Sequence, residues 1–170
     1  MNEEMTYRAT VCFLIKHGRI NLPVKKLEIG AGFRNGYGGK IQTGETPAEC
    51  AAREVLEEGR IKTWPQDVRR IALLRCHHRT ETDEKSLWIV HVFETGFWLG
   101  KPKETAEMGP PEWFPTDALP IHELMLDDRI WLPRVLIDRK PLVVTARYGP
   151  NQTILDEEVA IEEVETLPEE

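Results

Sequence analysis

The sequence predicts an α+β fold in one domain, and three observations support this prediction. Several segments rich in β-branched and aromatic residues are separated by short polar turns. A helix among them carries clear start and stop signals. No repeat or low-complexity linker divides the 170 residues, of which 41% are hydrophobic. We therefore expect a single domain over residues 1–170, with its core between about residues 7 and 165.

The strands are expected in three pairs, each joined by a turn: residues 10–16 with 19–24, 69–78 with 86–94, and 142–148 with 153–164. The turns contain the residues that commonly interrupt strands: His17-Gly18, the polar residues 80–85, and Gly149-Pro150-Asn151. Residues 110–115 hold too many prolines for a regular element, so Trp113-Phe114 is expected to anchor a loop to the core.

The first helix is predicted to begin after Thr46. Thr46 and Glu49 form a capping box around Pro47 at the first helical position, and Gly59 can close the helix in a left-handed conformation. Its apolar stripe consists of Ala48, Ala51, Ala52, Val55 and Leu56. A second helix is expected over residues 130–139, with Trp131, Leu132, Val135 and Leu136 buried, and residues 168–170 are expected to be frayed.

Three glutamates stand together on the first helix. Glu54, Glu57 and Glu58 occupy positions i, i+3 and i+4, so their side chains project from one face. Like charges at this spacing destabilise an isolated helix, and a bound cation would offset that cost. Carboxylates without cysteine or histidine favour a hard cation, Mg²⁺ or Mn²⁺. The alternative is a solvated acidic helix on an unrelated α/β protein.

A glycine-rich turn precedes this helix. Residues 35–40 read Asn-Gly-Tyr-Gly-Gly-Lys, and backbone without side chains can approach a ligand closely. Its amides, together with Lys40, suit a phosphate group. A phosphate-binding turn beside a metal-binding helix is the combination that cleavage of a pyrophosphate requires.

Residues 39–61 resemble the Nudix box, in which a glycine, a glutamate and the pattern REUxEExGU recur at fixed spacing. The positions that match are Gly39, Glu45, Arg53, Glu54, Val55, Glu57, Glu58 and Ile61. One position departs: Arg60 stands where the box has glycine, and Gly59 comes one residue early. The resemblance implies a Nudix α/β/α sandwich with a mixed sheet.

Short matches along nearly the whole chain resemble the MutT-homologue branch, the oxidised purine nucleoside triphosphatases. The matching segments are Lys25, residues 30–32, 35–40, 91–93, 107–108, 113–114 and 127–128, Trp131, and residues 153–156. This branch usually has an aromatic residue where Ile29 stands and a tryptophan where Met125 stands. Either Trp88 supplies the missing stacking surface or base selectivity has changed.

The resemblance implies Mg²⁺-dependent hydrolysis of oxidised purine nucleoside triphosphates, such as 8-oxo-dGTP and 2-hydroxy-dATP, to a monophosphate and pyrophosphate. The implied metal ligands are Glu54, Glu57, Glu58, Glu107 and a backbone carbonyl near Gly38. Glu54 or Glu57 would act as ligand or base, and Arg53 would orient a neighbouring glutamate. The alternative for Glu107 is an ordinary loop glutamate.

Base recognition is expected from Asn35, Asp127 and Asp128. Adjacent carboxylates in a dry pocket can share a proton, and exchange of that proton between them would admit both 6-oxo and 6-amino purines. The alternative is that the doublet caps a helix. The further implied substrate-binding residues are Thr10, Lys25, Tyr37, Gly38, Gly39, Lys40 and Met125, of which Thr10 equally suits core packing.

Composition and charge limit which binding partners and which cellular compartment we expect for this protein. The net charge of −7 argues against a nucleic-acid polymer, whereas metals and a few lysines can meet the charge of a nucleotide. The three cysteines form no CxxC or disulfide pattern. We find no targeting sequence and no apolar run long enough to span a membrane. We expect a cytoplasmic monomer.

Three rival functions fit parts of this sequence. Another Nudix specificity, for unmodified dNTPs, ADP-ribose, dinucleoside polyphosphates or coenzyme A, would keep the same metal chemistry. A non-catalytic Nudix module usually lacks box glutamates, all of which are present here. An acidic Ca²⁺-binding surface would need a DxDxDG loop, which the sequence lacks.

Overall fold

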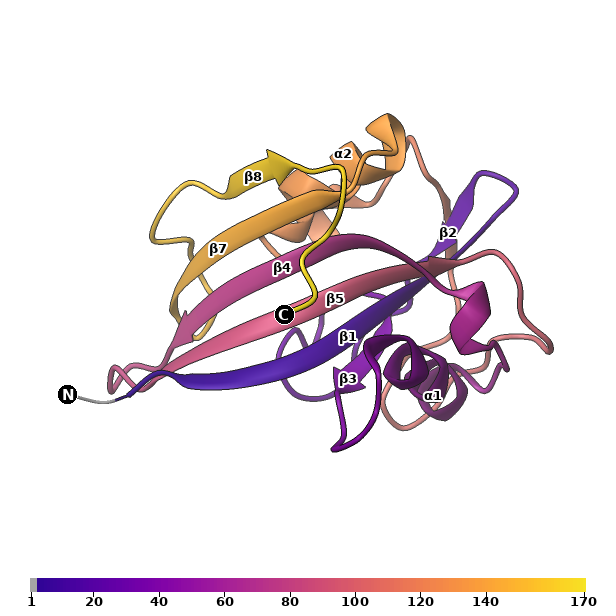
Figure 1. Ribbon diagram of the computed structural model, residues 1–170, viewed down its shortest axis with the longest axis horizontal. Helices are drawn as coiled ribbons and strands as arrows, with labels where there is room; N and C mark the ends of the chain where they lie inside the picture. The colour runs from indigo at the N-terminus through magenta and orange to yellow at the C-terminus, as the bar shows by residue number, and fades with distance from the viewer. Residues whose placement is uncertain (1–2) are drawn as a thin grey trace.

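The computed structural model describes residues 3–170 and is built around one mixed sheet (Figure 1). The strands lie in the order β6-β2-β1-β5-β4-β7-β8, and β3 pairs with β1 off this path. Their bounds are β1 Met5–Lys16, β2 Arg19–Asn21, β3 Tyr37–Lys40, β4 Arg69–Arg79, β5 Lys85–Thr95, β6 Trp113–Pro115, β7 Leu142–Pro150 and β8 Ala160–Glu163.

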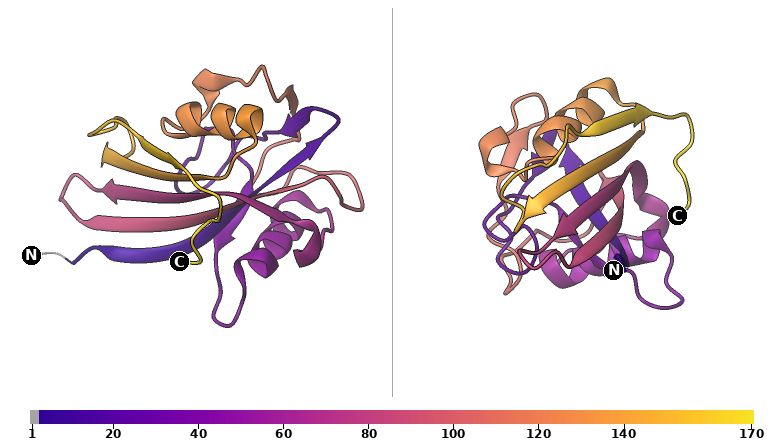
Figure 2. Two further views of the ribbon diagram at one scale, coloured as in Figure 1. Left: turned by 45° about the horizontal axis from the view of Figure 1, so that its top comes forward. Right: turned by 90° about the vertical axis from the view of Figure 1, so that its left-hand side faces the viewer.

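Two α-helices cover opposite faces of this sheet (Figure 2). Helix α1 spans Pro47–Gly59 and helix α2 spans Asp128–Asp138, and two short 3₁₀ helices, η1 Pro65–Asp67 and η2 Ile121–Glu123, lie in the connections. One core cluster lies between the sheet and α2, and a second lies between the sheet and α1. The structure thus confirms the predicted α/β/α sandwich.

Parallel pairing explains why the central strands are buried on both faces. Strand β5 lies parallel to β1 and antiparallel to β4, and β4 lies parallel to β7. Alternate residues of β1 therefore point to different cores: Phe13 packs in the α2 cluster, and Cys12 and Leu14 pack in the α1 cluster. The predicted β4–β5 hairpin is confirmed.

The irregular strands differ most from expectation. Residues 113–115 form β6, an edge strand paired with β2, although a loop was expected there. An edge strand needs hydrogen bonds on one side only, so it tolerates Pro115. Strands β2 and β8 are shorter than the expected 19–24 and 153–164, although β8 does pair with β7 as expected.

Helix α2 begins two residues earlier than expected and ends one residue earlier. The carbonyl of Asp127 accepts the amides of Ile130 at 3.0 Å and Trp131 at 3.2 Å, which brings Asp128 into the first turn. Its expected buried face is confirmed, because Trp131, Leu132, Val135 and Leu136 are all buried.

The predicted end of α1 is wrong. Gly59 remains helical, and Arg60 takes the left-handed conformation with φ 59° and ψ 26°. The amide of Arg60 donates to the carbonyl of Leu56 at 3.1 Å, which closes the last turn. The predicted capping box at Thr46 and Glu49 is confirmed.

The C-terminal residues are not frayed, contrary to expectation. Residues 164–170 cross over strands β4 and β5, on the part of the sheet that the helices leave uncovered (Figure 1). Arg70 donates to the carbonyl of Pro168 at 2.6 Å, Arg75 Nε donates to the carboxylate of Glu170 at 2.9 Å, and His91 Nε2 lies 2.6 Å from the carbonyl oxygen of Glu170. We call residues 164–170 the C-terminal strap. Across residues 3–170, no helix has the length and apolar character needed to cross a membrane.

Candidate active site

Helix α1 presents the three glutamates at different depths. Its apolar side, including Ala51 and Val55, packs in the cluster beneath β1 and β3. Glu54 is 7% exposed and Glu58 2% exposed, whereas the side chain of Glu57 is 53% exposed. The helix therefore buries the carboxylates of Glu54 and Glu58 and leaves that of Glu57 exposed to solvent.

Arg53 connects these glutamates to the preceding loop. Its Nε donates to Glu45 Oε1 at 2.7 Å and its Nη2 to Glu45 Oε2 at 3.0 Å, a bidentate pair. Its Nη1 donates to Glu54 Oε1 at 2.7 Å and to Glu57 Oε2 at 3.2 Å. The expected pairing of Arg53 with neighbouring glutamates is therefore present, and it fixes where two of the three carboxylates point.

The glycine-rich turn forms β3 and lies directly against these carboxylates. The amide of Gly38 donates to Glu58 Oε1 at 2.7 Å. A Cβ added at Gly39 would lie 2.4 Å from Glu54 Oε1, so a side chain there would displace the carboxylate. Glycine at position 39 therefore lets the backbone of β3 approach the carboxylate of Glu54 closely. The close approach of this backbone to a ligand stays a prediction.

Glu107 belongs to a loop that is tied to the end of α1. Thr105 Oγ1 donates to the carbonyl of Glu58 at 2.9 Å, and the amide of Lys26 donates to the carbonyl of Glu107 at 2.9 Å. The charge of Glu107 raises the pKa of both Glu54 and Glu58. Glu107 is therefore close enough to act on the same site electrostatically.

Burial and mutual repulsion disfavour the charged forms of these acids. Burial raises the pKa of Glu58 to about 8, and the charges of Glu54 and Glu107 add to that shift, while Lys25 opposes it. Burial likewise raises the pKa of Glu54, although its contact with Arg53 opposes the shift. Crowded carboxylates of this kind release their protons when a divalent cation binds.

The donor set fits a hard cation, because four carboxylates act on one another around α1 and each ligand atom is oxygen. In residues 3–170, no three His, Cys, Asp or Glu side chains are already arranged as a metal-binding group. Arg53 holds Glu54 and Glu57, and the Gly38 amide holds Glu58. Each of these bonds uses one oxygen of its carboxylate, which leaves the second oxygen as a position for a metal ion.

The acidic doublet, Asp127 and Asp128, lies at the start of α2 on the other side of the sheet. The two residues are 2% and 5% exposed. Trp131 Nε1 donates to Asp127 Oδ2 at 3.2 Å and to Asp128 Oδ1 at 3.0 Å. Asp127 occupies the N-cap position but makes no side-chain capping bond. The helix-cap alternative therefore does not explain the doublet.

Two other expected substrate-binding residues lie near one another. Lys25 Nζ donates to the carbonyl of Ile29 at 2.8 Å. A Cβ added at Gly30 would lie 3.0 Å from Met125 Sδ and 3.8 Å from Lys25 Cδ, so the loop after Lys25 packs against Met125. Met125 belongs to the α2 cluster that contains Trp131, and Ile29 packs against that cluster.

Asn35, expected to recognise the base, makes a local hydrogen bond: its Oδ1 accepts the amide of Gly36 at 2.8 Å.

Of three further expected substrate-binding residues, two are buried and the third, Lys40, is exposed. Tyr37 is 1% exposed and its hydroxyl accepts from Asn21 Nδ2 at 2.9 Å, so its side chain packs in the core instead of lining a surface. Thr10 is 1% exposed, with its hydroxyl 3.2 Å from Cys50 Sγ, as its core-packing alternative required. Lys40 Nζ lies 4.4 Å from the ring centre of Tyr7 and 5.4 Å from that of Trp88.

The proposed stacking residue Trp88 has a protein partner on its ring. Its centroid lies 4.7 Å from that of Tyr7, with 29° between the ring planes. Trp88 is half-buried and packs against the α2 cluster that also contains Met125. Its role in base stacking stays a prediction.

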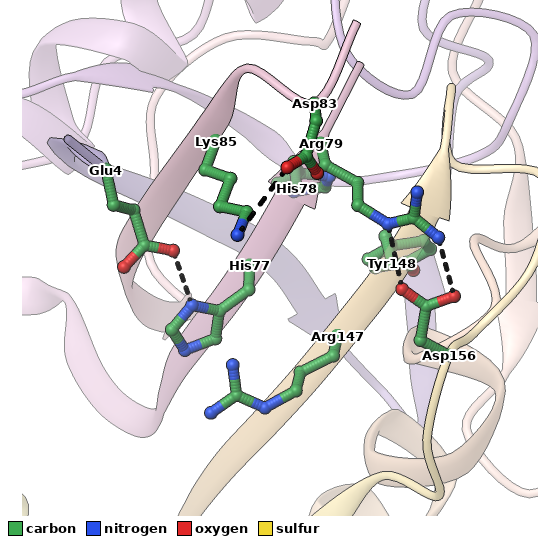
Figure 3. A pocket seen from close by; sticks show the side chains of 9 residues that line it. All are labelled: Glu4, His77, His78, Arg79, Asp83, Lys85, Arg147, Tyr148 and Asp156. Atoms are coloured by element: carbon green, nitrogen blue, oxygen red, sulfur yellow. Dashed lines mark hydrogen bonds and ion pairs between the residues drawn. The ribbon is translucent and has the colours of Figure 1, made fainter. Parts of the chain in front are cut away.

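Two hollows are lined by residues other than Glu54, Glu57 and Glu58 of α1. One, of about 380 Å³, is lined by residues 6–8 and 40–45. The other, of about 310 Å³, lies at the far ends of β4 and β7 and is shown in Figure 3; we call it the β4–β7 cavity. It is lined by Glu4, His77, His78, Arg79, Asp83, Lys85, Arg147, Tyr148 and Asp156.

Tyr148 joins that cavity to the acidic doublet, and the sequence did not predict this. The hydroxyl of Tyr148 donates to Asp127 Oδ1 and accepts the amide of Asp127 at 3.1 Å. The ring of Tyr148 stacks on His78 with centroids 5.0 Å apart. Tyr148 follows Val144 and Ala146 on one face of β7, so the sequence pattern indicated only a buried aromatic residue.

Comparison with known proteins agrees with this architecture. Residues 6–135 match the NUDIX domain. The chain is 33% identical over 158 residues to the oxidized purine nucleoside triphosphate hydrolase of zebrafish (Danio rerio), covering 93% of this chain and 96% of the relative. It is 32% identical over 146 residues to the protein of the same name from Mus musculus, covering 86% and 89%.

Solved structures show the same fold. The mMutator MutT protein of Bacillus halodurans superposes with a TM-score of 0.76 at 23% identity, covering 92% of this chain and 97% of that one. The MutT NUDIX hydrolase of Burkholderia pseudomallei superposes with a TM-score of 0.60 at 28% identity, covering 78% and 99%. With the box glutamates gathered on α1 and the domain match spanning most of its length, this chain belongs to the Nudix family of pyrophosphohydrolases.

Proposed function

We propose that this enzyme hydrolyses oxidised purine nucleoside triphosphates, such as 8-oxo-dGTP and 2-hydroxy-dATP, to the monophosphate and pyrophosphate, and so sanitises the nucleotide pool. The observation that carries the proposal is the buried acidic doublet: Asp127 and Asp128 share the indole N–H of Trp131. Paired acids in a dry site can read the donors and acceptors of a purine edge. The names of the relatives support the same substrate class.

In this proposal Glu54, Glu57, Glu58 and Glu107 hold Mg²⁺ or Mn²⁺, with a backbone carbonyl near Gly38. The bound cation would neutralise phosphate oxygens and lower the pKa of a water molecule. Glu54 or Glu57 takes the proton from the attacking water, and the raised pKa of Glu54, due chiefly to burial, favours Glu54. Arg53 orients both side chains through its contacts with them.

The substrate is held by residues on both sides of this centre. The charge of Lys25 lowers the pKa of Glu58, and this supports a role for its ammonium in binding the phosphates of the substrate. Met125 and Ile29 would line the base site in place of aromatic rings. The three cysteines are free and buried, which is in keeping with a reducing compartment, and we propose a cytoplasmic monomer.

The test is pyrophosphate release with Mg²⁺ from a panel of 8-oxo-dGTP, 2-hydroxy-dATP, dGTP, dATP, dCTP, ADP-ribose and diadenosine tetraphosphate. Glu57→Gln serves as the blank, because Glu57 is exposed and its replacement leaves the core intact. A preference for an oxidised purine supports the proposal. If the enzyme prefers another nucleotide, oxidised purine triphosphates are not its substrates. We would then attribute the changed specificity to Ile29 and Met125.

A further inference from the structure

The acidic doublet is held asymmetrically, and the source of the asymmetry is Tyr148. We propose that Tyr148 holds Asp127 as the hydrogen-bond acceptor of the doublet, so that Asp128 carries the shared proton and the site favours one purine edge, 6-oxo or 6-amino, over the other. Tyr148 is therefore a specificity-determining positioning residue. This inference rests on the proposed function, in which the doublet reads the base.

Both oxygens of Asp127 face donors. Oδ1 accepts from the hydroxyl of Tyr148. Oδ2 accepts from Trp131 Nε1 at 3.2 Å and lies 3.8 Å from Cys76 Sγ. An indole N–H can only donate, so a proton on Oδ2 would point at another proton. The surroundings of Asp127 therefore favour its ionised form.

The backbone amide of Asp127 also fixes the direction of the Tyr148 hydroxyl. Its oxygen accepts the amide of Asp127 at 3.1 Å, so its own proton is directed to the remaining acceptor, Oδ1. The ring is held in place by stacking on His78, at 5.0 Å and 11° between planes. Figure 3 shows Tyr148 behind the Arg79–Asp156 ion pair of the β4–β7 cavity. Tyr148 therefore has little freedom to turn its hydroxyl toward Asp128.

Asp128 is placed to keep the proton. Its Oδ1 accepts from Trp131 Nε1 at 3.0 Å, which leaves Oδ2 as the position for a proton. Burial raises the pKa of Asp128 well above its usual value, and the charge of Asp127 raises it further. Burial also raises the pKa of Asp127, but the bonds from Tyr148, Trp131 and Cys76 oppose that shift. Electrostatics and geometry therefore assign the proton to the same residue.

Within residues 3–170, the groups that face Asp127 include no cation. They are Cys76 from β4, Tyr148 from β7, and Asp128 and Trp131 from α2, with His78 beyond the tyrosine ring. Burial raises the pKa of the Cys76 thiol well above its usual value, and burial lowers the pKa of His78 to about 4, so both are neutral at pH 7. Hydrogen bonds stabilise the charge on Asp127, and the bond from Tyr148 lowers its pKa more than any of the others.

The consequence concerns substrate choice. The 6-oxo and 6-amino purines present a donor and an acceptor in opposite order, so a doublet that accepts both must exchange its proton between the two acids. Because Tyr148 opposes protonation of Asp127, one order is favoured. Removing the hydroxyl would restore exchange and broaden the specificity.

The test compares kcat/KM for 8-oxo-dGTP and 2-hydroxy-dATP in the wild type and in Tyr148→Phe, which keeps the ring. We expect the wild-type ratio to lie far from one, and Tyr148→Phe to move it toward one by roughly tenfold, the effect of one hydrogen bond to a charged group. Thr63→Val is the matched control, because it removes a buried hydroxyl that donates to the carbonyl of Phe97 and makes no contact with the doublet, and its ratio should not change. Thermal unfolding of each variant confirms that it is folded.

A second readout needs no turnover. In protein labelled with ¹³C at aspartate carboxyl groups, assigned with Asp127→Asn and Asp128→Asn, Asp127 should give the shift of a carboxylate and Asp128 that of a neutral acid at pH 7. Tyr148→Phe should move both toward intermediate values. A wild-type ratio near one, an unchanged ratio in Tyr148→Phe, or a neutral Asp127 overturns the inference. If no purine triphosphate is hydrolysed, the proposed function fails, and the carboxyl shifts alone support or reject the role of Tyr148.

Discussion

Gly59 lies directly against the ring of Tyr37: a Cβ at position 59 would be 2.9 Å from Cζ of that ring. The Nudix box has a glycine at the position of Arg60, and here Arg60 itself takes the left-handed conformation, with φ 59°. Gly59 is needed for another reason, because only a glycine fits against the ring of Tyr37.

The two positions should therefore respond in opposite directions. Gly59→Ala is expected to lower the free energy of unfolding by about 1–3 kcal/mol, because the new methyl group collides with Tyr37. Arg60→Gly is expected to raise it by up to about 1 kcal/mol, because glycine adopts a positive φ without strain. Urea unfolding of both variants measures the difference, and a loss of stability in Arg60→Gly would contradict the assignment.

Arg53→Lys should lower kcat by about 10- to 100-fold with little change in KM. A lysine cannot reproduce the planar fork that contacts Glu45, Glu54 and Glu57 together, so the carboxylates lose their orientation. Arg69→Lys, which alters a comparable contact with Glu94 away from α1, is the matched control. Steady-state kinetics on the preferred substrate decide the outcome, and equal losses in both variants would remove the special role of Arg53.

Mg²⁺ should stabilise the protein against heat. A ligand that binds only the folded state contributes about 2.7 kcal/mol at a free concentration about 100 times its Kd. Glu57→Gln should weaken this effect, whereas Glu84→Gln, on the distant β4–β5 turn, should leave it unchanged. Differential scanning fluorimetry with and without a chelator makes the comparison, and an unaltered shift in Glu57→Gln would exclude that residue as a ligand.

Acid should destabilise the protein through His78. Burial lowers the pKa of His78 to about 4 from an unfolded value near 6.5, and its Nδ1 has no hydrogen-bond partner in residues 3–170. Between these pH values the unfolded chain binds a proton that the folded chain does not, so this contribution to stability is complete above pH 6.5 and is lost as the pH falls toward 4.

His78→Phe keeps the stacking on Tyr148 and removes this titration. Relative to the variant, the wild type should lose stability toward acid by up to about 1.4 kcal/mol per pH unit between pH 6.5 and 4. The comparison must be made against the variant, because burial raises the pKa of Asp128, which acts in the opposite sense. Parallel pH profiles of the unfolding free energy would contradict the prediction.

The C-terminal strap should stabilise the sheet. Removal of residues 165–170 is expected to lower the free energy of unfolding by about 1–3 kcal/mol, because Arg70 and His91 lose their carbonyl acceptors. Glu170→Gln should cost less than about 1 kcal/mol, because its ion pair with Arg75 is partly exposed. Chemical unfolding compares the three proteins, and a truncated protein as stable as the full chain would show that the strap merely rests on the surface.

The sequence alone determined much of this protein. The capping box at Thr46, the strands on either side of residues 80–85 and the buried face of α2 follow from local patterns, because caps, turns and periodicity act over a few residues. The glutamates of α1 were found in the same way, since their spacing places them on one face whatever surrounds the helix.

Tertiary structure decided the rest. The sequence patterns did not indicate that Tyr37 is buried against Gly59, that residues 113–115 pair with β2, or that the C-terminal strap lies on Arg70 and His91. The same holds for the hydrogen bond from Tyr148 to Asp127, which joins residues 21 positions apart. Each of these depends on contacts between elements distant in the chain, and their free energy comes from packing and burial that exist only once the sheet has formed.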